Sequence, residues 1–200
     1  HLRAAGHTVQ VCDADLYGVR RLGVALRTVA WPRRRWWVRH HLHAAAFSAR
    51  SEMCARALRT AGPGFDVLLQ VGATFEPPAS CELPLVLYCD SNAELSRLGA
   101  ASGHSEGASL TASELADVRD REERVYRRAT IIFTMSERLR RSFIEDFGIP
   151  PERLVTVHCG PNVDLAPSVM TEARLAAPPT VLFVGRDFDR KGGALLIEAF

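Results

Sequence analysis

Short apolar segments alternate with helix-forming segments along this 200-residue chain, and this alternation restricts the possible folds more than any other feature. The clearest apolar segments carry few charges and have the length of strands: residues 65–71, 84–89, 130–135 and 154–158. Such strands are typical of sheets covered by helices on both faces. Regular alternation favours a doubly wound parallel sheet, whose ligands bind beyond the carboxyl ends of the strands. The predicted fold class is therefore α/β, with a Rossmann-like parallel sheet and helices on both faces.

Several helices have recognisable ends in the sequence. Thr111 and Glu114 have the spacing of a capping box for a helix that extends to about residue 128. Ser136 and Gly148 are suited to begin and end the following helix. An apolar stripe predicts another helix over 42–57. The other segments are interpreted as a helix end before Gly6, a short strand at 7–12, a stretch without clear periodicity at 13–30 and a loop at 100–113.

The composition excludes several classes of protein. With 47% hydrophobic and 24% charged residues, the chain is neither disordered nor collagen-like. It has no run of about 18 apolar residues that would span a membrane, and no signal peptide opens it. Its five cysteines have no paired spacing, which predicts free thiols in a reducing compartment. A cytoplasmic location is therefore expected, with membrane association left open.

Positive charge is concentrated in one part of the chain. Between Leu16 and Thr60 there are ten arginines and one acid, Glu52. The segment Arg33–Arg39 also contains Trp36 and Trp37, a combination suited to the surface of an anionic membrane. A surface helix whose tryptophans pack inward is an alternative explanation. Nucleic-acid binding is not expected, because no recognised module accompanies the basic segment.

The end of the chain has the pattern of an anion-binding turn. Residues 180–184 form a predicted strand, Gly185 permits a sharp turn, and helix-forming composition follows from residue 194. Arg186 and Lys191, the only lysine, stand before that helix. A helix start has unpaired N–H groups and a partial positive charge, so this turn is suited to a diphosphate. The alternative is a solvated surface loop.

Several spaced motifs resemble one family when they are taken together. They are residues 124–136, 147–149, Val157-His158-Cys159-Gly160-Pro161-Asn162-Val163-Asp164, Gly185-Arg186, Lys191-Gly192 and the helix residues Leu196, Ala199 and Phe200. This set resembles the central segment of retaining glycosyltransferases of the two-Rossmann GT-B architecture, the family 4 group. The resemblance implies a GT-B N-terminal domain over 1–164, a linker over 165–179, and the start of a second Rossmann-like domain over 180–200.

The resemblance also implies roles for single residues. Arg186 and Lys191 match the pair that binds the donor diphosphate, with Gly185 at their turn, while Gly160 and Asn162 match a loop at the interdomain cleft. Tyr88 and Asp90 lie where such enzymes place acceptor-side residues, often a histidine, which is absent here. Asp90 is therefore an acceptor-side candidate, or simply a cap of the following turn.

The implied activity is transfer of a sugar from a nucleotide diphosphate sugar to an acceptor hydroxyl with retention, with no cofactor or metal. The acceptor is unknown; a lipid-linked or cell-envelope glycan would agree with the basic segment. The family's glycine-rich loop and its acidic donor-binding pair would lie outside residues 1–200, so this segment alone is expected to be inactive. A sugar-nucleotide epimerase on the same scaffold and a catalytically silent nucleotide-sugar or membrane-binding module are the alternatives.

Two metal-site patterns are weaker. Asp13-Ala14-Asp15 and Asp187-Phe188-Asp189 both read D-x-D, which holds a divalent metal in a different glycosyltransferase fold, but three residues match by chance often. His40, His41 and His43 suggest zinc, yet adjacent histidines point to different faces of a helix, and a solvated face is favoured.

Overall fold

The computed structural model describes residues 2–101, 106–160, 180–185, 188 and 191–200. The chain divides into two compact units, His1–His158 and Cys159–Phe200, and each is described by itself. The predicted linker at 165–179 lies outside the described residues. The predicted boundaries of the two domains therefore stay predictions.

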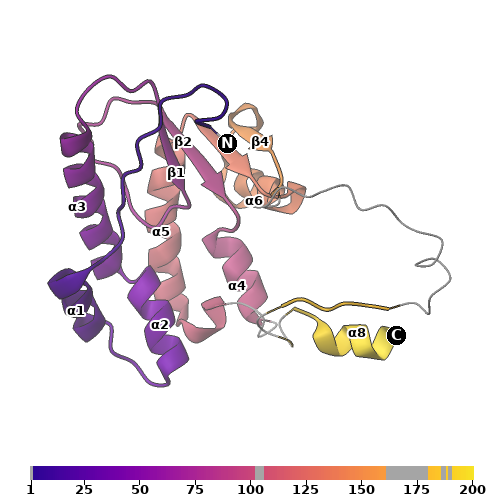
Figure 1. Cartoon of the computed structure of the whole chain (residues 1–200). Coiled ribbons are helices and arrows are strands. Elements are labelled where there is room, and N and C mark those ends of the chain that lie inside the picture. The colour runs from indigo at the N-terminus through magenta and orange to yellow at the C-terminus, as the bar shows by residue number, and fades with distance from the viewer. Residues whose placement is uncertain (1, 102–105, 161–179, 186–187, 189–190) are drawn as a thin grey trace. The chain divides into compact units, whose positions relative to one another are not determined.

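A parallel sheet of four strands lies in the first unit (Figure 1). Its strands follow the chain in the order β1-β2-β3-β4, and every neighbouring pair is parallel. Each strand lies within one of the four apolar segments, so the predicted α/β class with a Rossmann-like parallel sheet is confirmed. The strands are β1 (Leu68–Val71), β2 (Leu85–Cys89), β3 (Ile131–Thr134) and β4 (Leu154–Thr156).

Helices account for most of the remaining described residues. In the first unit they are α1 (Gly18–Arg27), α2 (Arg33–Leu42), α3 (Ala44–Ala61), α4 (Ala93–Ala101), α5 (Ala112–Arg128) and α6 (Glu137–Phe147), with 3-10 turns η1 (Glu106–Ser109) and η2 (Pro151–Arg153). The second unit contains α8 (Gly193–Ala199). Four of these differ from expectation: α1 occupies the stretch without clear periodicity, η1 lies in the predicted loop, and α2 and α3 are separate helices that meet at His43.

The predicted capping residues act as the sequence indicates. Thr111 and Glu114 form a reciprocal capping box at the start of α5. The Ser136 hydroxyl accepts a hydrogen bond from the N–H of Leu139 at the start of α6, and Gly148 ends that helix in the left-handed conformation, with φ of 62°. These local signals fix where two of the helices begin and one of them ends.

The core is built between the sheet and α5 and α6. Leu87 and Ile132, paired across β2 and β3, are fully buried. Tyr126 of α5 meets Phe143 of α6 edge to face, with the ring centres 4.7 Å apart. Phe47 of α3 joins the same cluster. Burial of this apolar surface supplies most of the driving force for the fold.

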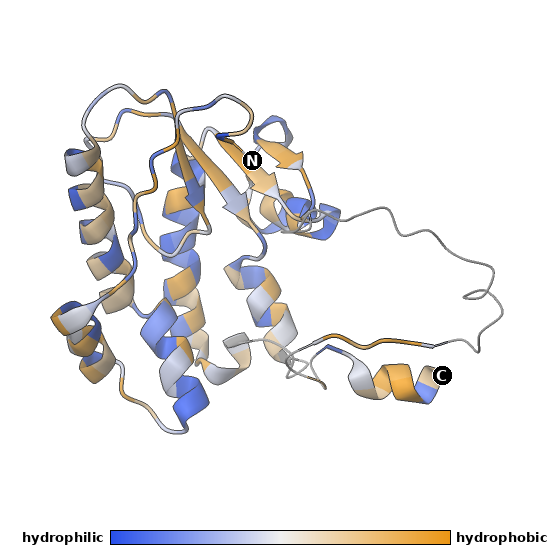
Figure 2. Cartoon of the chain, viewed as in Figure 1, coloured by the Kyte–Doolittle hydropathy of each residue, from blue (hydrophilic) through white to orange (hydrophobic). Residues whose placement is uncertain are grey.

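The two faces of the sheet differ in burial. Along β2, Leu85, Leu87 and Cys89 are buried, whereas the alternating Val86 and Tyr88 are only partly buried. On neighbouring strands the second face carries the exposed residues Leu69, Val71 and Val155. Figure 2 shows the strands largely in orange, with paler stretches at their less hydrophobic residues. Within the described residues, the helices thus cover one face closely and leave the other partly exposed.

Two predicted strands are absent as strands. Residues 7–12 and 180–184 have no regular secondary structure, and neither segment belongs to the four-stranded sheet. A strand is defined by ladder hydrogen bonds to a neighbour, and apolar composition alone does not supply one. Both predictions are wrong for the described residues.

The α5 cap provides a test that separates capping from ion pairing. The Glu114 carboxylate lies 2.9 Å from Nε of Arg39 and 3.5 Å from Nη2 of Arg35. Burial is the largest influence on its pKa and raises it, but hydrogen bonding to Thr111 and the two arginines together prevail and lower the pKa. The ion pairs therefore stabilise the fold at neutral pH and stop doing so as the pH falls through the folded-state pKa of Glu114.

We expect Thr111→Ala to lower the free energy of unfolding by about 1 kcal/mol at every pH tested, because it removes the cap. Glu114→Gln keeps the capping geometry and loses only the ion pairs, so its cost should be about 0.5 to 1 kcal/mol at neutral pH and vanish in acid. Urea unfolding at neutral and acidic pH measures both. Thr111→Ser serves as the control, and equal pH dependence of the two variants would contradict this assignment.

Candidate functional site

The carboxyl end of β2 forms one corner of the sheet edge where ligands of parallel sheets bind. Asp90 follows the strand directly and its side chain is exposed. Within the described part of the chain, no hydrogen bond or ion pair holds the Asp90 carboxylate. It is thus available to a hydroxyl group from outside the protein.

Tyr88 connects this corner to the end of β4. Its hydroxyl donates a hydrogen bond to the carbonyl of His158, with the two oxygens 3.2 Å apart. His158 has a φ of 58°, a left-handed conformation that is unusual for a residue other than glycine. Such backbone conformations cluster at functional sites and need support from their surroundings. The Tyr88 hydroxyl and the hydrogen bond from the N–H of Val157 to the carbonyl of Thr134 supply that support.

Buried polar groups fix the chain just after Asp90. Asn92 accepts a hydrogen bond from the N–H of Leu95 and so satisfies a free donor in the first turn of α4. Its amide donates to the hydroxyl of Ser142 at 3.0 Å, and that hydroxyl donates to Asp146 at 2.6 Å. The start of α4 is thereby tied to α6.

Glu122 of α5 holds the same corner from a second direction. Its Oε2 atom accepts hydrogen bonds from the N–H of Ala93 at 2.8 Å and from the hydroxyl of Tyr126 at 2.9 Å. Burial raises the pKa of Glu122 to about 7, although both hydrogen bonds and the charge of Arg121 act in the opposite direction. A carboxylate at a helix start is stabilised by the helix dipole. Asn92 and Glu122 therefore position the segment that carries Asp90.

The donor-side candidates belong to the second unit. At Gly185 an added Cβ would lie 3.1 Å from the Phe183 ring and 3.3 Å from Cγ of Lys191, so a side chain would crowd this turn. Lys191 is exposed and precedes α8, and Gly160 is also exposed. Arg186 and Asn162 lie outside the described residues. Their predicted roles, and those of Gly185, Lys191 and Gly160, stay predictions.

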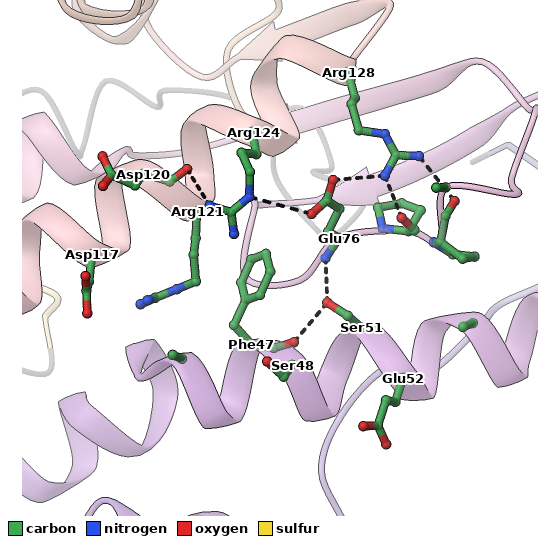
Figure 3. Close-up of a pocket in the computed structure, with 15 residues that line it drawn as sticks. Phe47, Ser48, Ser51, Glu52, Glu76, Asp117, Asp120, Arg121, Arg124 and Arg128 are labelled. Atoms are coloured by element: carbon green, nitrogen blue, oxygen red, sulfur yellow. Dashed lines mark hydrogen bonds and ion pairs between the residues drawn. The ribbon is translucent and has the colours of Figure 1, made fainter.

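An open groove of about 830 Å³ runs between α3 and α5 (Figure 3). Three arginines line it from α5, but each has partners in the fold. Arg128 lies 3.0 Å from Glu76 and donates to the carbonyls of Pro77 and Pro78, while Arg124 lies 4.0 Å from the same carboxylate. Arg121 donates to the carbonyl of Leu42 and lies over the Phe47 ring. Because its three arginines are used internally, the groove is interpreted as a helix junction, and the candidate site remains the sheet edge.

The predicted metal patterns have structural roles where they are described. His43 caps α3 by accepting a hydrogen bond from the N–H of Ala45. His41 lies against Arg50, and burial, followed by the charge of Arg50, lowers its pKa. The Asp13 carboxylate accepts hydrogen bonds from the N–H of Asp15 and the hydroxyl of Tyr17. Across the described ranges, no group of three or more His, Cys, Asp or Glu side chains is placed to hold a metal ion.

Sequence reasoning missed Asn92 and Glu122. Asn92 carried a signal, because an asparagine shortly after a strand is a common helix cap. Glu122 carried none, since it lies in a helix with acids at 120 and 123, and only the fold places it opposite the start of α4.

None of the helices within the described ranges has the length and apolar character needed to cross a bilayer.

Glu122→Gln tests the buried network by its effect on stability. With a pKa of about 7, folded Glu122 keeps a proton that the unfolded chain releases near pH 4.5, so the free energy of unfolding falls as the pH rises between these values. The glutamine variant cannot ionise. It should gain roughly 1 to 3 kcal/mol relative to wild type between pH 5 and pH 8.

Urea unfolding at several pH values measures this difference, and Glu145→Gln on the exposed side of α6 is the matched control. If the two variants showed the same pH dependence, Glu122 would not be buried as described.

Comparison with known proteins gives one family match. The model of the family described as Glycosyltransferase Family 4 matches residues 1–165, which is most of the chain. No curated protein and no solved structure matches the chain.

Proposed function

The chain belongs to glycosyltransferase family 4, and from this membership we propose that its residues form part of a hexosyltransferase of GT-B architecture. The enzyme moves a sugar from a nucleotide diphosphate sugar to an acceptor hydroxyl, with retention of configuration at the anomeric carbon. Residues 1–164 form the acceptor-side domain and residues 180–200 begin the donor-side domain. The reaction serves glycan biosynthesis.

One observation carries the acceptor side of this proposal. Asp90 presents an exposed carboxylate at the carboxyl end of β2, while Asn92 and Glu122 hold the backbone beside it. A carboxylate on a fixed backbone orients a sugar hydroxyl by accepting its hydrogen bond. Tyr88, from the same strand end, supports the neighbouring turn at His158. Asp90 is thus the residue that orients the acceptor, and Tyr88 is a positioning residue.

The donor side depends on charge. When the bond between the anomeric carbon and the diphosphate breaks, negative charge develops on the leaving oxygen. Arg186 and Lys191 neutralise that charge, and Gly185 lets the backbone approach the diphosphate. The acceptor oxygen bonds to the anomeric carbon on the same face, and its proton passes to the released diphosphate. Gly160 and Asn162 close the first domain against the donor through backbone and amide contacts.

Two cations from the chain perform the task that a divalent metal performs in other transferases, so the proposed reaction is independent of metal. No cofactor besides the donor substrate takes part. A hydroxyl of a lipid-linked or cell-envelope glycan is the proposed acceptor class, and the basic segment around α1 and α2 supports it.

In the full-length transferase that contains this chain, Lys191→Ala should lower kcat/KM by about 10- to 150-fold, because one charge-assisted contact to the leaving diphosphate contributes roughly 1.5 to 3 kcal/mol. Nucleoside diphosphate binding, measured by calorimetry, should weaken in parallel. Both assays should give the same values when a chelator is present.

Arg56→Ala, which removes an exposed arginine on α3, is the control and should behave as wild type. Unchanged kinetics for Lys191→Ala would disprove the donor-side assignment, and loss of activity with the chelator would disprove metal independence.

Asp90→Asn tests the acceptor side separately. The variant should raise the KM for the acceptor while the affinity for the nucleoside diphosphate stays as in wild type, since the amide is a weaker acceptor for a hydroxyl hydrogen bond than a carboxylate. Steady-state kinetics with varied acceptor measures the effect. An equal loss of donor affinity would mean that Asp90 does not act on the acceptor.

A further inference from the structure

The helix α1 turns an apolar row away from the protein. Val19, Leu22 and Leu26 have the i, i+3, i+7 spacing of one helix face and are 85%, 59% and 67% exposed. Val24 lies on the opposite side and is buried against α3 with Leu16 and Ala46. An amphipathic surface helix normally directs its apolar stripe to the core. Here the longer apolar row points outward.

The segment between α1 and α2 continues this surface. Val29 is 60% exposed and Trp31 is 84% exposed. In Figure 2, hydrophobic and hydrophilic residues share α1 and the connection to α2 at the periphery of the molecule. Large apolar side chains exposed in a cluster mark an interaction site, whereas single ones need no explanation. We call the apolar residues Val19, Leu22, Leu26, Val29 and Trp31 the α1 surface.

Unpaired arginines accompany the α1 surface. Arg27 of α1 and Arg33 and Arg34 of α2 are exposed, and none of the three has an ion pair to any described residue. By contrast, Arg20 pairs with Glu52, and Arg35 and Arg39 pair with Glu114.

The structure thus changes the expectation for Arg33–Arg39. Arg35 and Arg39 are used inside the fold, and the indole nitrogen of Trp36 donates to the carbonyl of Ala25 on α1. Trp36 therefore packs inward, as the alternative explanation had it, whereas Trp37 is 53% exposed. The remaining exposed cations and the apolar row belong mainly to α1 and its connection to α2.

We propose that the α1 surface, together with Arg27, Arg33 and Arg34, docks on a lipid bilayer that contains anionic lipids. Apolar side chains enter the boundary between head groups and acyl chains, and arginines remain beside the phosphates. Tryptophan is favoured at that depth. This inference concerns a surface outside the proposed catalytic site, and it would hold if the proposed transfer were wrong.

A bilayer fits these residues better than other partners do. A second copy of the chain would bring the same three arginines together, and like charges facing each other oppose association. A nucleic acid would use the arginines through its phosphates and leave the outward leucines and valines in water. A bilayer with anionic lipids offers negative charge and apolar volume next to each other.

Vesicle binding tests the proposal. The protein should sediment with vesicles of phosphatidylcholine mixed with phosphatidylglycerol, and much less with phosphatidylcholine alone. The double variant Arg33→Gln with Arg34→Gln removes two positive charges. Each cation near an anionic surface strengthens binding about fivefold, so the variant should bind about 25-fold more weakly. Added salt should weaken wild-type binding as well.

The apolar row is tested by Leu22→Ser with Leu26→Ser, which should lower the bound fraction even at low salt. Both leucines are exposed, so the variant should fold as wild type does, which circular dichroism checks. The matched controls are Leu98→Ser, an exposed leucine of α4, and Arg138→Gln with Arg141→Gln, two exposed arginines of α6. Both controls should bind as wild type does.

A spectroscopic measurement reports insertion directly. Binding should shift tryptophan emission to shorter wavelength, and Trp31→Phe should remove that shift while binding persists. Three results would overturn the proposal: no difference between the two vesicle compositions, full binding by the double-serine variant, or a wild-type dimer in lipid-free light scattering that the double-serine variant converts to a monomer.

Discussion

The carboxylate of Glu122 is the group on which the geometry of the sheet edge depends. It accepts hydrogen bonds from the first N–H of α4 and from the hydroxyl of Tyr126, and so joins the corner after β2 to the helix that packs beneath the sheet. Asn92 adds a connection to α6 through Ser142. Three helices, α4, α5 and α6, therefore determine where the backbone around Asp90 lies. The exposed side chain of Asp90 is thus attached to a backbone that these helices hold in place.

This arrangement has an energetic cost that the core must offset. Burial of Glu122 disfavours its charged form, which is why its pKa is raised to about 7 in spite of two hydrogen bonds. The Tyr126 ring beside it packs edge to face on Phe143 and Phe147. Burial of apolar side chains around the polar network thus offsets the free-energy cost of burying Glu122. Local costs of this kind are common at functional sites.

In the first unit, the basic segment that contains α1 and α2 contributes both to internal ion pairs and to an exposed surface. α2 directs Arg35 and Arg39 toward Glu114 at the cap of α5, which orders the helix layer. α1 uses Val24 to attach to α3 and keeps its larger apolar row outside. The basic segment is therefore divided between internal ion pairs and an exposed face, and these two uses follow from which arginines have an acid within reach.

Local signals in the sequence determined the four strands of the sheet, the α5 capping box and the ends of α6, because each depends on residues within a few positions of one another, but apolar composition alone wrongly predicted strands at 7–12 and 180–184. The α/β class followed from the order of those elements, and the family resemblance followed from the spaced motifs of residues 124–200. The tertiary structure alone decided that Glu122 meets Ala93, that Arg121 bonds to the carbonyl of Leu42 instead of pairing along its own helix with Asp117, and that the apolar row of α1 faces outward. Helical periodicity states which residues share a face, but contacts between residues distant in sequence decide where that face points.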